Sequence, residues 1–568
     1  MQEKPDSTAL VFAGRRITYA ELDRLTHLAA GDLDGAGFGS VRALCVPAHK
    51  SPETVALLLA AWRQGINTLV PSPALGAAAL STLIAQAHGP LSAAAVPGGG
   101  ATLSREEADP TLSDGFSVPD PGESLLTLTT SGSTGVPKLV PVRTEAFDRF
   151  GDWATEKFGI DGGTRSLSFS PLNFDLALLD VWTVLEAGGT VVLADAGASG
   201  DAGYLRELTR SNEVTLVQGV PLLHRLLAAD DARYPTVRTV VFTGEAVSEQ
   251  GLRDAFAACP AARFHNVFGC TETNDSFIQD IDPAAYVHPL PIGAPIDGTD
   301  AVLLIEGPDG TEVLRGPGTG ELLVHTPFQT CGYLEQARNA HAFMPDPRGG
   351  GAMFYRTGDL VHRDADGRYF LQGRTDFQVK VRGVRTNTLE VETVLGAHPD
   401  VVEAAVVALP CPEAGTRLHA EVVRRDGTSL SSLGLRAYAA KHLPRHAVPS
   451  SGGARLHPAA EDRDRETGPQ FDQEDPTERR RPMSTVTNDP IRAYIVNEFL
   501  AGEDAEDLTD DFDLIESTVV NSLGLVRLIS WISETYSIPV DDIPLEPAAY
   551  RTLADIRGFV SKAARAAV

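Results

Sequence analysis

Leu126-Thr-Leu-Thr-Thr-Ser-Gly-Ser-Thr-Gly-Val-Pro-Lys138 joins a short apolar run to a loop of small residues. The apolar, β-branched part, residues 125–130, predicts a buried strand. The loop from Ser131 to Gly135 contains two glycines and three hydroxyl groups, and Lys138 adds a positive charge. Because glycine lets several backbone N–H groups approach one anion, this composition favours a phosphate site. A flexible linker of the same composition is the alternative.

The stretch from Thr130 to Lys138 resembles the ATP-phosphate loop of the adenylate-forming enzymes, which include acyl-CoA synthetases, luciferases and peptide-synthetase adenylation domains. It differs from the P-loop of nucleotide hydrolases, in which lysine directly follows glycine and precedes serine or threonine. The resemblance implies ATP as substrate and Lys138 as a catalytic residue. It also implies a phosphate-binding set made of Thr130, Ser131, Gly132, Ser133, Thr134 and Gly135.

Length and composition limit the possible classes of protein. The 568 residues exceed a single hydrophobic core and predict several domains. A formal charge of −28 argues against nucleic acid or an anionic membrane as the main partner. The five cysteines are scattered and lack metal-site spacing, which predicts reduced thiols in a cytoplasmic protein. No apolar run approaches the ~20 residues of a membrane span, and the first residues do not resemble a signal peptide.

The chain predicts an α/β multi-domain architecture. Thr18 and Glu21 form a helix-starting capping box, and Ser51 precedes Pro52 as the N-cap of a second helix. Strands then alternate with helices, which indicates layered α/β structure. With the resemblance, we expect four segments: a large adenylate-forming α/β domain at 1–375, a small α+β C-terminal subdomain at 376–450, a flexible linker at 451–487 and an all-α, four-helix carrier domain at 488–568.

Asp175 follows Phe174 and precedes apolar residues, where an unpaired carboxylate is costly to bury. A helix N-cap is one use of such an aspartate. In adenylation domains for α-amino acids, the resemblance assigns this position to the substrate ammonium. The aligned pocket residues are Asp175, Leu176, Leu179, Gln218, Val241, Thr243, Val267, Asp275 and Ser276. Their opening resembles glycine-type pockets and implies a small α-amino acid, while Asp275 and Ser276 would alternatively meet a polar or cationic side chain.

Two further motifs resemble the family's nucleotide-binding segments. Thr243-Gly244-Glu245 follows a predicted strand and matches the segment that lies along adenine. In Phe268-Gly-Cys-Thr271-Glu272, the resemblance implies that Phe268 stacks on adenine, that Thr271 binds the α-phosphate and that Glu272 binds Mg²⁺, for which a carboxylate is a suitable hard ligand. Cys270 replaces the usual proline, and we expect it to act as a small hydrophobic residue.

Three residues near the predicted domain junction complete this set. Asp359 in Tyr-Arg-Thr-Gly-Asp matches the ribose-binding carboxylate, although a turn aspartate after glycine is the alternative. Arg374 matches a nucleotide-binding arginine. Asp376 matches the hinge about which the family's C-terminal subdomain turns between half-reactions.

The match to the family fails at the end of the small subdomain. The family normally has a Gly-Lys-x-Asp-Arg-like motif there, whose lysine bridges the substrate carboxylate and the α-phosphate. Aligned on Asp464-Arg465, Asp462 stands in place of that lysine, and no lysine occurs between Lys441 and Lys562. Loss of one preorganised charge costs on the order of 10²–10³ in rate. We therefore expect that Arg463 or Arg465 substitutes, or that adenylation is slow.

The tail predicts a separate carrier unit. Residues 490–500 have apolar positions at helical spacing, and Asn521-Ser522-Leu523 resembles the carrier-protein motif whose serine receives 4′-phosphopantetheine. Asn521 replaces the usual aspartate. A helix N-cap is the alternative role for Ser522, and Ser517 is the alternative modified serine.

Taken together, the resemblance implies ATP-dependent activation of an amino acid as aminoacyl-AMP and its transfer to the chain's own carrier, in specialised-metabolite or antibiotic biosynthesis. The implied partners are a phosphopantetheinyl transferase, downstream tailoring or condensation enzymes and a small MbtH-like activator. The alternatives are a weakly active adenylation scaffold whose carrier is loaded in trans, an acyl-CoA synthetase-like ligase and a purely structural role for both serine motifs.

Overall fold

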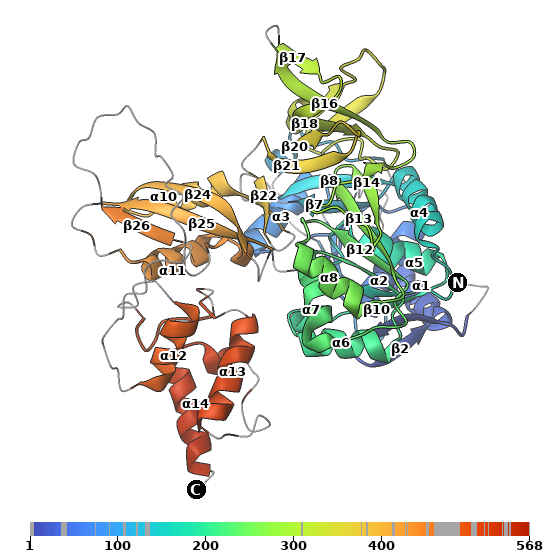
Figure 1. Ribbon diagram of the computed structural model, residues 1–568. Helices are drawn as coiled ribbons and strands as arrows, with labels where there is room; N and C mark the ends of the chain where they lie inside the picture. Colours follow the sequence, from blue (N-terminus) through green and yellow to red (C-terminus); the bar gives the residue numbers. More distant parts are fainter. Residues whose placement is uncertain are drawn as a thin grey trace. The chain divides into compact units, whose positions relative to one another are not determined.

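The computed structural model describes residues 5–566 apart from 36–42, 74, 90, 106–109, 121–122, 131–136, 308–309, 376–377, 382–383, 412–414, 426–427, 429, 450–453, 459–488, 501–507, 516, 518, 521, 537, 539–543 and 545–546. The chain divides into two compact units (Figure 1). The first comprises residues 1–387 and 412–415, and the second comprises 388–411 and 416–568.

A nine-stranded sheet forms the centre of the first unit. Its five central pairings, from β1 through β10, β9, β11 and β12 to β13, are parallel, and its edge pairings are antiparallel. In spatial order the strands are β15 (Ala294–Pro295), β14 (Asn274–Ile281), β13 (Arg263–Cys270), β12 (Thr239–Thr243), β11 (Leu216–Gly219), β9 (Arg165–Ser168), β10 (Thr190–Leu193), β1 (Thr8–Phe12) and β2 (Arg15–Thr18).

Both faces of this sheet are buried, as expected for a parallel sheet covered on two sides. Along β12, Val240 and Phe242 belong to one hydrophobic cluster, whereas Val241 between them belongs to another. This alternation explains why the predicted strand is an uninterrupted apolar run. The helices of the first unit are α1 (Tyr19–Asp34), α2 (Pro52–Arg63), α3 (Ala77–Gln86), α4 (Thr144–Phe158), α5 (Val184–Glu186), α6 (Ala202–Ser211), α7 (Pro221–Ala228), α8 (Glu249–Ala258) and α9 (Gln336–Ala342).

A six-stranded sheet in the same unit carries the stretch around which the sequence is organised. Its strands, in spatial order, are β6 (Ala101–Arg105), β5 (Leu91–Ala95), β3 (Leu44–Cys45), β4 (Thr68–Leu69), β7 (Ser124–Thr130) and β8 (Lys138–Arg143). The predicted strand at 125–130 is confirmed as β7, which is one residue longer at its start. Strands β7 and β8 are antiparallel, and Thr130 pairs with Lys138. The loop between them therefore begins and ends at facing residues.

A second six-stranded sheet and a hairpin complete the first unit. The sheet is antiparallel and contains β17 (Gly310–Val313), β16 (Asp300–Gly307), β18 (Gly318–His325), β20 (Met353–Arg363) and β19 (Phe343–Pro345), with β21 (Tyr369–Arg374) paired to β20. The hairpin consists of β22 (Gln378–Val381) and β23 (Val384–Asn387).

Both predicted helix starts are confirmed. The Thr18 hydroxyl accepts a hydrogen bond from the Glu21 amide, at an N–O distance of 3.1 Å, at the start of α1. The Ser51 hydroxyl accepts one from the Thr54 amide at 3.0 Å, and Pro52 opens α2. Each cap satisfies one of the amides that a helix leaves without an internal partner.

The second unit contains a small α+β part and a helical part. The α+β part has a three-stranded sheet and two helices: α10 (Thr388–Gly396), β24 (Val401–Cys411), β25 (Gly415–Arg424), α11 (Ser432–His442) and β26 (Ala454–Pro458). The helical part contains α12 (Pro490–Phe499), α13 (Ser522–Tyr536) and α14 (Leu553–Ala566), with a short 3₁₀ helix at Pro547–Tyr550. Apolar residues of the three helices, among them Ile495, Leu528 and Ile556, share one buried cluster.

The structure corrects the predicted start of the linker. Ala454–Pro458 lies inside the segment 451–487 that composition indicated as linker, but it forms β26 and pairs with β25 in parallel register. Backbone pairing with an existing strand gives this short, polar segment hydrogen-bond partners that its side chains do not indicate. Within the described part of the chain, no helix combines the length and apolar character needed to span a bilayer.

Candidate active site

The predicted substrate residues gather at the carboxyl ends of the parallel strands. Gln218 is the second-last residue of β11, Thr243 ends β12, and Asp175 lies on the segment after β9. Ligands of open α/β sheets bind at this edge, because the loops that leave the strands meet there. The Gln218 side-chain amide donates to the Leu176 carbonyl at 3.2 Å and holds the Asp175 segment against β11.

Asp175 is not a helix N-cap. The π-helix Leu178–Thr183 that follows it is capped by Ala177, without a side-chain hydrogen bond. Instead, Asp175 Oδ2 accepts a hydrogen bond from the Thr271 hydroxyl at 2.9 Å. Burial raises the pKa of this carboxyl above its ordinary value, against the opposing effects of the Lys380 charge and the Thr271 hydrogen bond. A carboxylate that is partly withdrawn from water, as Asp175 is, is suited to a cationic ligand.

The β13–β14 hairpin brings Thr271 to Asp175. A side chain at Gly269 would place its Cβ only 2.1 Å from the Asn274 carbonyl oxygen, so glycine is required where the two strands approach. The pairing register shifts between Phe268 and Gly269, which marks a bulge in β13. Bulges re-aim the residues beside them, and here Thr271 and Glu272 follow directly.

Asp275 and Ser276 differ in orientation. They are neighbours in β14, so their side chains point to opposite faces of the strand. The Ser276 hydroxyl lies 3.0 Å from the Thr273 hydroxyl. Burial and the nearby Asp175 charge raise the pKa of Asp275 to about 8. The structure therefore associates Asp275, rather than Ser276, with Asp175. The remaining predicted pocket residues Leu179, Val241, Thr243 and Val267 are buried.

Glu272 lies in a polar cluster that links it to Lys138. Glu272 is fully buried, and its carboxylate accepts a hydrogen bond from the Tyr333 hydroxyl. That hydroxyl lies 3.3 Å from the Tyr355 hydroxyl, and Lys138 Nζ lies 5.3 Å from the centre of the Tyr333 ring. Cys270 packs beside this cluster as the small hydrophobic residue that its sequence context predicts.

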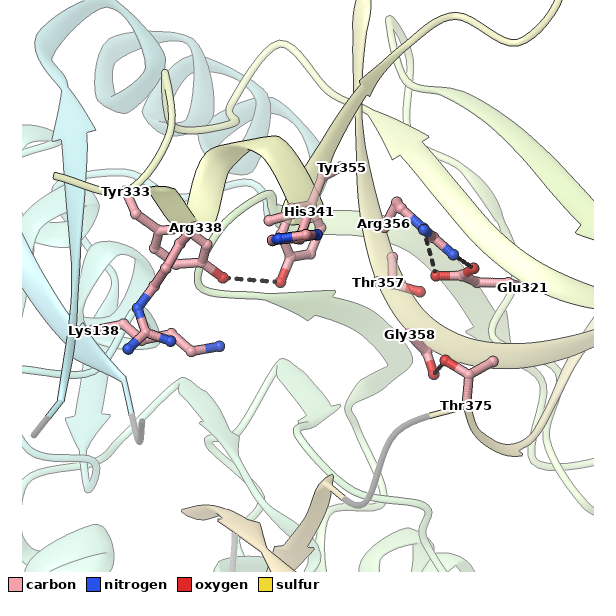
Figure 2. Close-up of a pocket in the computed structure, with 11 residues that line it drawn as sticks. Lys138, Glu321, Tyr333, Arg338, His341, Tyr355, Arg356, Thr357, Gly358 and Thr375 are labelled. Atoms are coloured by element: carbon pink, nitrogen blue, oxygen red, sulfur yellow. Dashed lines mark hydrogen bonds and ion pairs between the residues drawn. The ribbon is translucent and has the colours of Figure 1, made fainter. Parts of the chain in front are cut away.

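A cavity of about 370 Å³ opens next to this cluster. Figure 2 shows Lys138 and the two tyrosines on one side and the Arg356–Gly358 segment and Thr375 on the other. Arg338 and His341 of α9 project into the same space. Its size falls within the range of small-molecule pockets.

Asp359 and Arg374 are brought together next to Gly358 and Thr375, which line this cavity. They lie on the paired strands β20 and β21, and Arg374 Nη1 donates to Asp359 Oδ1 at 2.5 Å. Arg374 Nη2 also donates to the Thr357 carbonyl at 2.8 Å. Asp359 is buried within a strand and is not the turn aspartate of the alternative interpretation.

The predicted adenine segment lies at the end of β12. Gly244 and Glu245 follow Thr243 directly, and Gly244 has a φ of 85°, a backbone conformation that glycine adopts without strain. Phe268 is half-buried and packs edge-on against Phe277, with ring centres 6.0 Å apart.

Several predicted residues lie outside the described part of the chain: Ser131, Gly132, Ser133, Thr134, Gly135, Asp376, Asp462, Arg463, Arg465 and Asn521. Thr130, at the entrance to the loop, has a buried hydroxyl with no hydrogen-bond partner among the described residues. Ser522 is the first residue of α13. Ser517 is buried, and its hydroxyl donates to the Asp513 carbonyl, which disfavours it as a modification site.

The site offers one carboxylate, that of Glu272, as a ligand for Mg²⁺. Mg²⁺ is commonly held by one or two carboxylates together with substrate phosphates, and Glu272 supplies one such carboxylate. Within the described ranges, no group of three or more metal-ligating side chains occurs, so the phosphates would have to complete the coordination.

Tyr333, Tyr355, Arg338 and His341 were missed as site residues. Tyr333 stands in a Gly-Tyr-Leu segment, and Tyr355 directly precedes the Arg-Thr-Gly-Asp run. Their position beside recognised motifs is the sequence feature that indicates a place in the site. Arg338 and His341 have no such signal, because only the position of α9 brings them to the cavity.

Comparison with known proteins assigns the family. The pattern of the AMP-binding enzyme family matches residues 1–334, and that of the AMP-binding enzyme C-terminal domain matches residues 390–452. The chain belongs to the AMP-binding enzyme family. Among its relatives in this family is an L-proline–[L-prolyl-carrier protein] ligase of Pseudomonas fluorescens, 31% identical over 471 residues, which cover 78% of this chain and 91% of that protein.

Other members extend the comparison. A phosphinothricin tripeptide synthetase of Streptomyces viridochromogenes is 31% identical over 78% of this chain but only 42% of its own length. The solved structure of NpsA-ThdA, an artificially fused adenylation–PCP di-domain from Klebsiella oxytoca, is 26% identical, with a TM-score of 0.66 over 79% of this chain and 90% of that one. This AMP-binding enzyme is therefore of the amino acid adenylation type found in nonribosomal peptide synthetases.

Proposed function

We propose that this enzyme activates a small α-amino acid as aminoacyl-AMP and transfers it to a carrier domain at residues 488–568 of the same chain. The observation that carries the first part is the hydrogen bond between Thr271 and Asp175. It joins the predicted ammonium-binding carboxylate to the motif that continues into Glu272, so that an amino acid held at Asp175 lies next to the predicted phosphate site.

In the activation step, a carboxylate oxygen of the amino acid attacks the α-phosphorus of ATP, the bond to the bridging oxygen breaks, and pyrophosphate leaves. Positioning and charge stabilisation supply most of the catalysis of such phosphoryl chemistry. Asp175 orients the amino group. Lys138 holds negative charge on the phosphates at one end of the cavity, and the Asp359–Arg374 pair holds the ribose at the other.

Mg²⁺ bound at Glu272 would neutralise charge on the phosphate oxygens. Tyr333 then serves as a positioning residue, because its hydroxyl orients the Glu272 carboxylate while its ring lies beside Lys138. The phosphate loop, Gly244, Glu245 and Phe268 complete the nucleotide site in this proposal, and Asp376 is its hinge.

The amino acid proposal rests on the pocket around Asp175. Leu179, Val241 and Val267 contribute buried apolar surface, and Gln218 is committed to the Leu176 carbonyl, so little polar surface is left for a long side chain. Asp275 is the exception, and a polar or cationic side chain is the alternative that it supports.

The carrier proposal rests on Ser522 at the start of α13 and on the helical cluster around it. 4′-Phosphopantetheine on Ser522 would supply the thiol that accepts the aminoacyl group as a thioester, with AMP as the leaving group when the acyl–phosphate bond breaks. A carrier on the same chain raises the local thiol concentration to roughly the millimolar range when the linker spans the distance. A phosphopantetheinyl transferase, downstream tailoring or condensation enzymes in specialised metabolism, an MbtH-like activator and a cytoplasmic location belong to this proposal.

Two measurements test it. ATP–pyrophosphate exchange over a panel of amino acids should show exchange that depends on the amino acid. Intact mass after incubation with a transferase and coenzyme A should show one phosphopantetheine adduct, which Ser522→Ala removes and the matched Ser517→Ala variant keeps. An adduct that persists in Ser522→Ala would overturn the carrier assignment.

A second function has one specific observation in its favour. No lysine lies between Lys441 and Lys562, where the family places a catalytic one. A weakly active scaffold whose carrier is loaded by another enzyme would therefore show the adduct on Ser522 but no exchange with any amino acid.

A further inference from the structure

The cavity beside Lys138 is lined by more positive than negative groups. Lys138, Arg338 and Arg356 contribute cationic side chains, His341 contributes an imidazole, and Glu321 is the one carboxylate among the described lining residues. Arg356 donates two hydrogen bonds to Glu321, so that this pair is neutral as a unit. Arg338 is likewise paired with a carboxylate, that of Glu335, so Lys138 provides the positive charge on the side formed by β8 and α9.

One nitrogen of the Arg338 guanidinium is already hydrogen-bonded to a nearby residue. Its Nε donates to the Glu335 carboxylate, three residues earlier. Among the described residues, neither of its terminal nitrogens has a hydrogen-bond partner. Figure 2 shows the Arg338 side chain extending toward Lys138, with His341 on the same wall. Glu335 thus fixes the guanidinium, and its remaining N–H groups face the cavity.

The walls of the cavity define where a phosphate chain would run. Thr357 and Gly358 line one side and directly precede Asp359, the proposed ribose ligand. Lys138 lines the other side and ends the proposed phosphate loop. A nucleotide whose ribose lies at Asp359 would direct its terminal phosphates toward Lys138, Arg338 and His341.

We propose that Arg338 and His341 form a binding site for the pyrophosphate part of ATP and for pyrophosphate as the leaving group. This inference rests on the proposed function and assigns to it two residues that no sequence motif indicated. A planar guanidinium matches two phosphate oxygens at once, and charge develops on those oxygens as the bond to the α-phosphorus breaks. The site also supplies positive charge to a chain that lacks the C-terminal lysine.

The test measures the Michaelis constant for inorganic pyrophosphate in the exchange reaction. Arg338→Ala should raise it about tenfold or more, the range of a lost charge-assisted hydrogen bond, and should leave the constant for the amino acid within about twofold. Arg338→Lys should recover part of the loss, and His341→Ala should cause a smaller rise. Arg348→Ala is the matched control, because Arg348 pairs with Asp346 and Asp300 away from the cavity.

A binding measurement separates this inference from the proposed function. Inorganic pyrophosphate alone should raise the Tm of the wild-type protein, and Arg338→Ala should lose that shift. A pyrophosphate constant in Arg338→Ala equal to that of Arg348→Ala, or an unchanged thermal shift, would overturn the inference. Wild-type protein that is stabilised by pyrophosphate but shows no amino-acid-dependent exchange would contradict the proposed function and leave the anion site standing.

Discussion

The Thr271 hydroxyl donates a hydrogen bond to Asp175 Oδ2 at 2.9 Å, across 96 positions of sequence. Asp175 comes from the segment after β9, and Thr271 comes from the β13–β14 hairpin. The contact places the motif proposed for the amino acid next to the motif proposed for the nucleotide.

Thr271→Val should weaken amino acid binding. The substitution removes a donor to the half-buried Asp175 carboxylate, so we expect the Michaelis constant for the amino acid to rise about 10-fold to 100-fold in the exchange assay. Thr82→Val is a suitable control, because the Thr82 hydroxyl donates to the Ala78 carbonyl on an exposed helix. A rise in the constant for ATP alone would instead assign Thr271 to the nucleotide only.

Lys138→Ala should abolish exchange rather than slow it. Removing one preorganised charge costs on the order of 10²–10³ in rate, and no C-terminal lysine is present to compensate. Lys157→Ala, which breaks a surface ion pair with Asp280, should keep near wild-type exchange. Exchange in Lys138→Ala above one-tenth of the wild-type rate would be incompatible with the proposed role.

Tyr333→Phe should destabilise the folded protein. The Glu272 carboxylate is fully buried and would lose the hydroxyl that donates to it, which costs about 1–3 kcal/mol or more in free energy of unfolding. Tyr204→Phe is the control, since the Tyr204 hydroxyl only accepts from the Asp195 amide at the surface. Equal urea midpoints for the two variants would show that the Glu272 contact is not stabilising.

Asp275 should make the stability of the ligand-free protein depend on pH. Its pKa is raised from 3.8 to about 8 by burial and by Asp175, so the folded state binds a proton that the unfolded state has released. That contribution is fully present below about pH 4 and is lost as the pH rises to about 8. Thermal unfolding from pH 4 to pH 9 should therefore show Asp275→Asn gaining stability relative to wild type. A difference that does not change with pH would contradict the raised pKa.

The strand before the phosphate loop, the helix caps at Thr18 and Ser51 and the strand ending at Thr243 could be predicted because each follows from a local pattern. The alternation of buried residues, a hydroxyl before a helix and a turn after an apolar run are all visible over a few residues. Each motif of the first unit is likewise recognised from its own few residues.

The remaining features depend on tertiary structure. Whether Asp175 caps a helix or meets Thr271 depends on the bulge at Gly269, and no local pattern at Asp175 reports it. Tyr333 reaches Glu272, and Arg338 reaches the Lys138 cavity, only because α9 and its flanking segments pack there. The residues of β26 do not indicate a strand by themselves. The segment is a strand because it pairs with β25, and a pairing partner cannot be read from local composition.

ATP–pyrophosphate exchange by the wild-type protein, with and without single amino acids, tests the central claim most directly. We predict exchange with one or a few small α-amino acids and none in their absence. Exchange that proceeds equally without any amino acid would contradict the assignment of this site to amino acid activation.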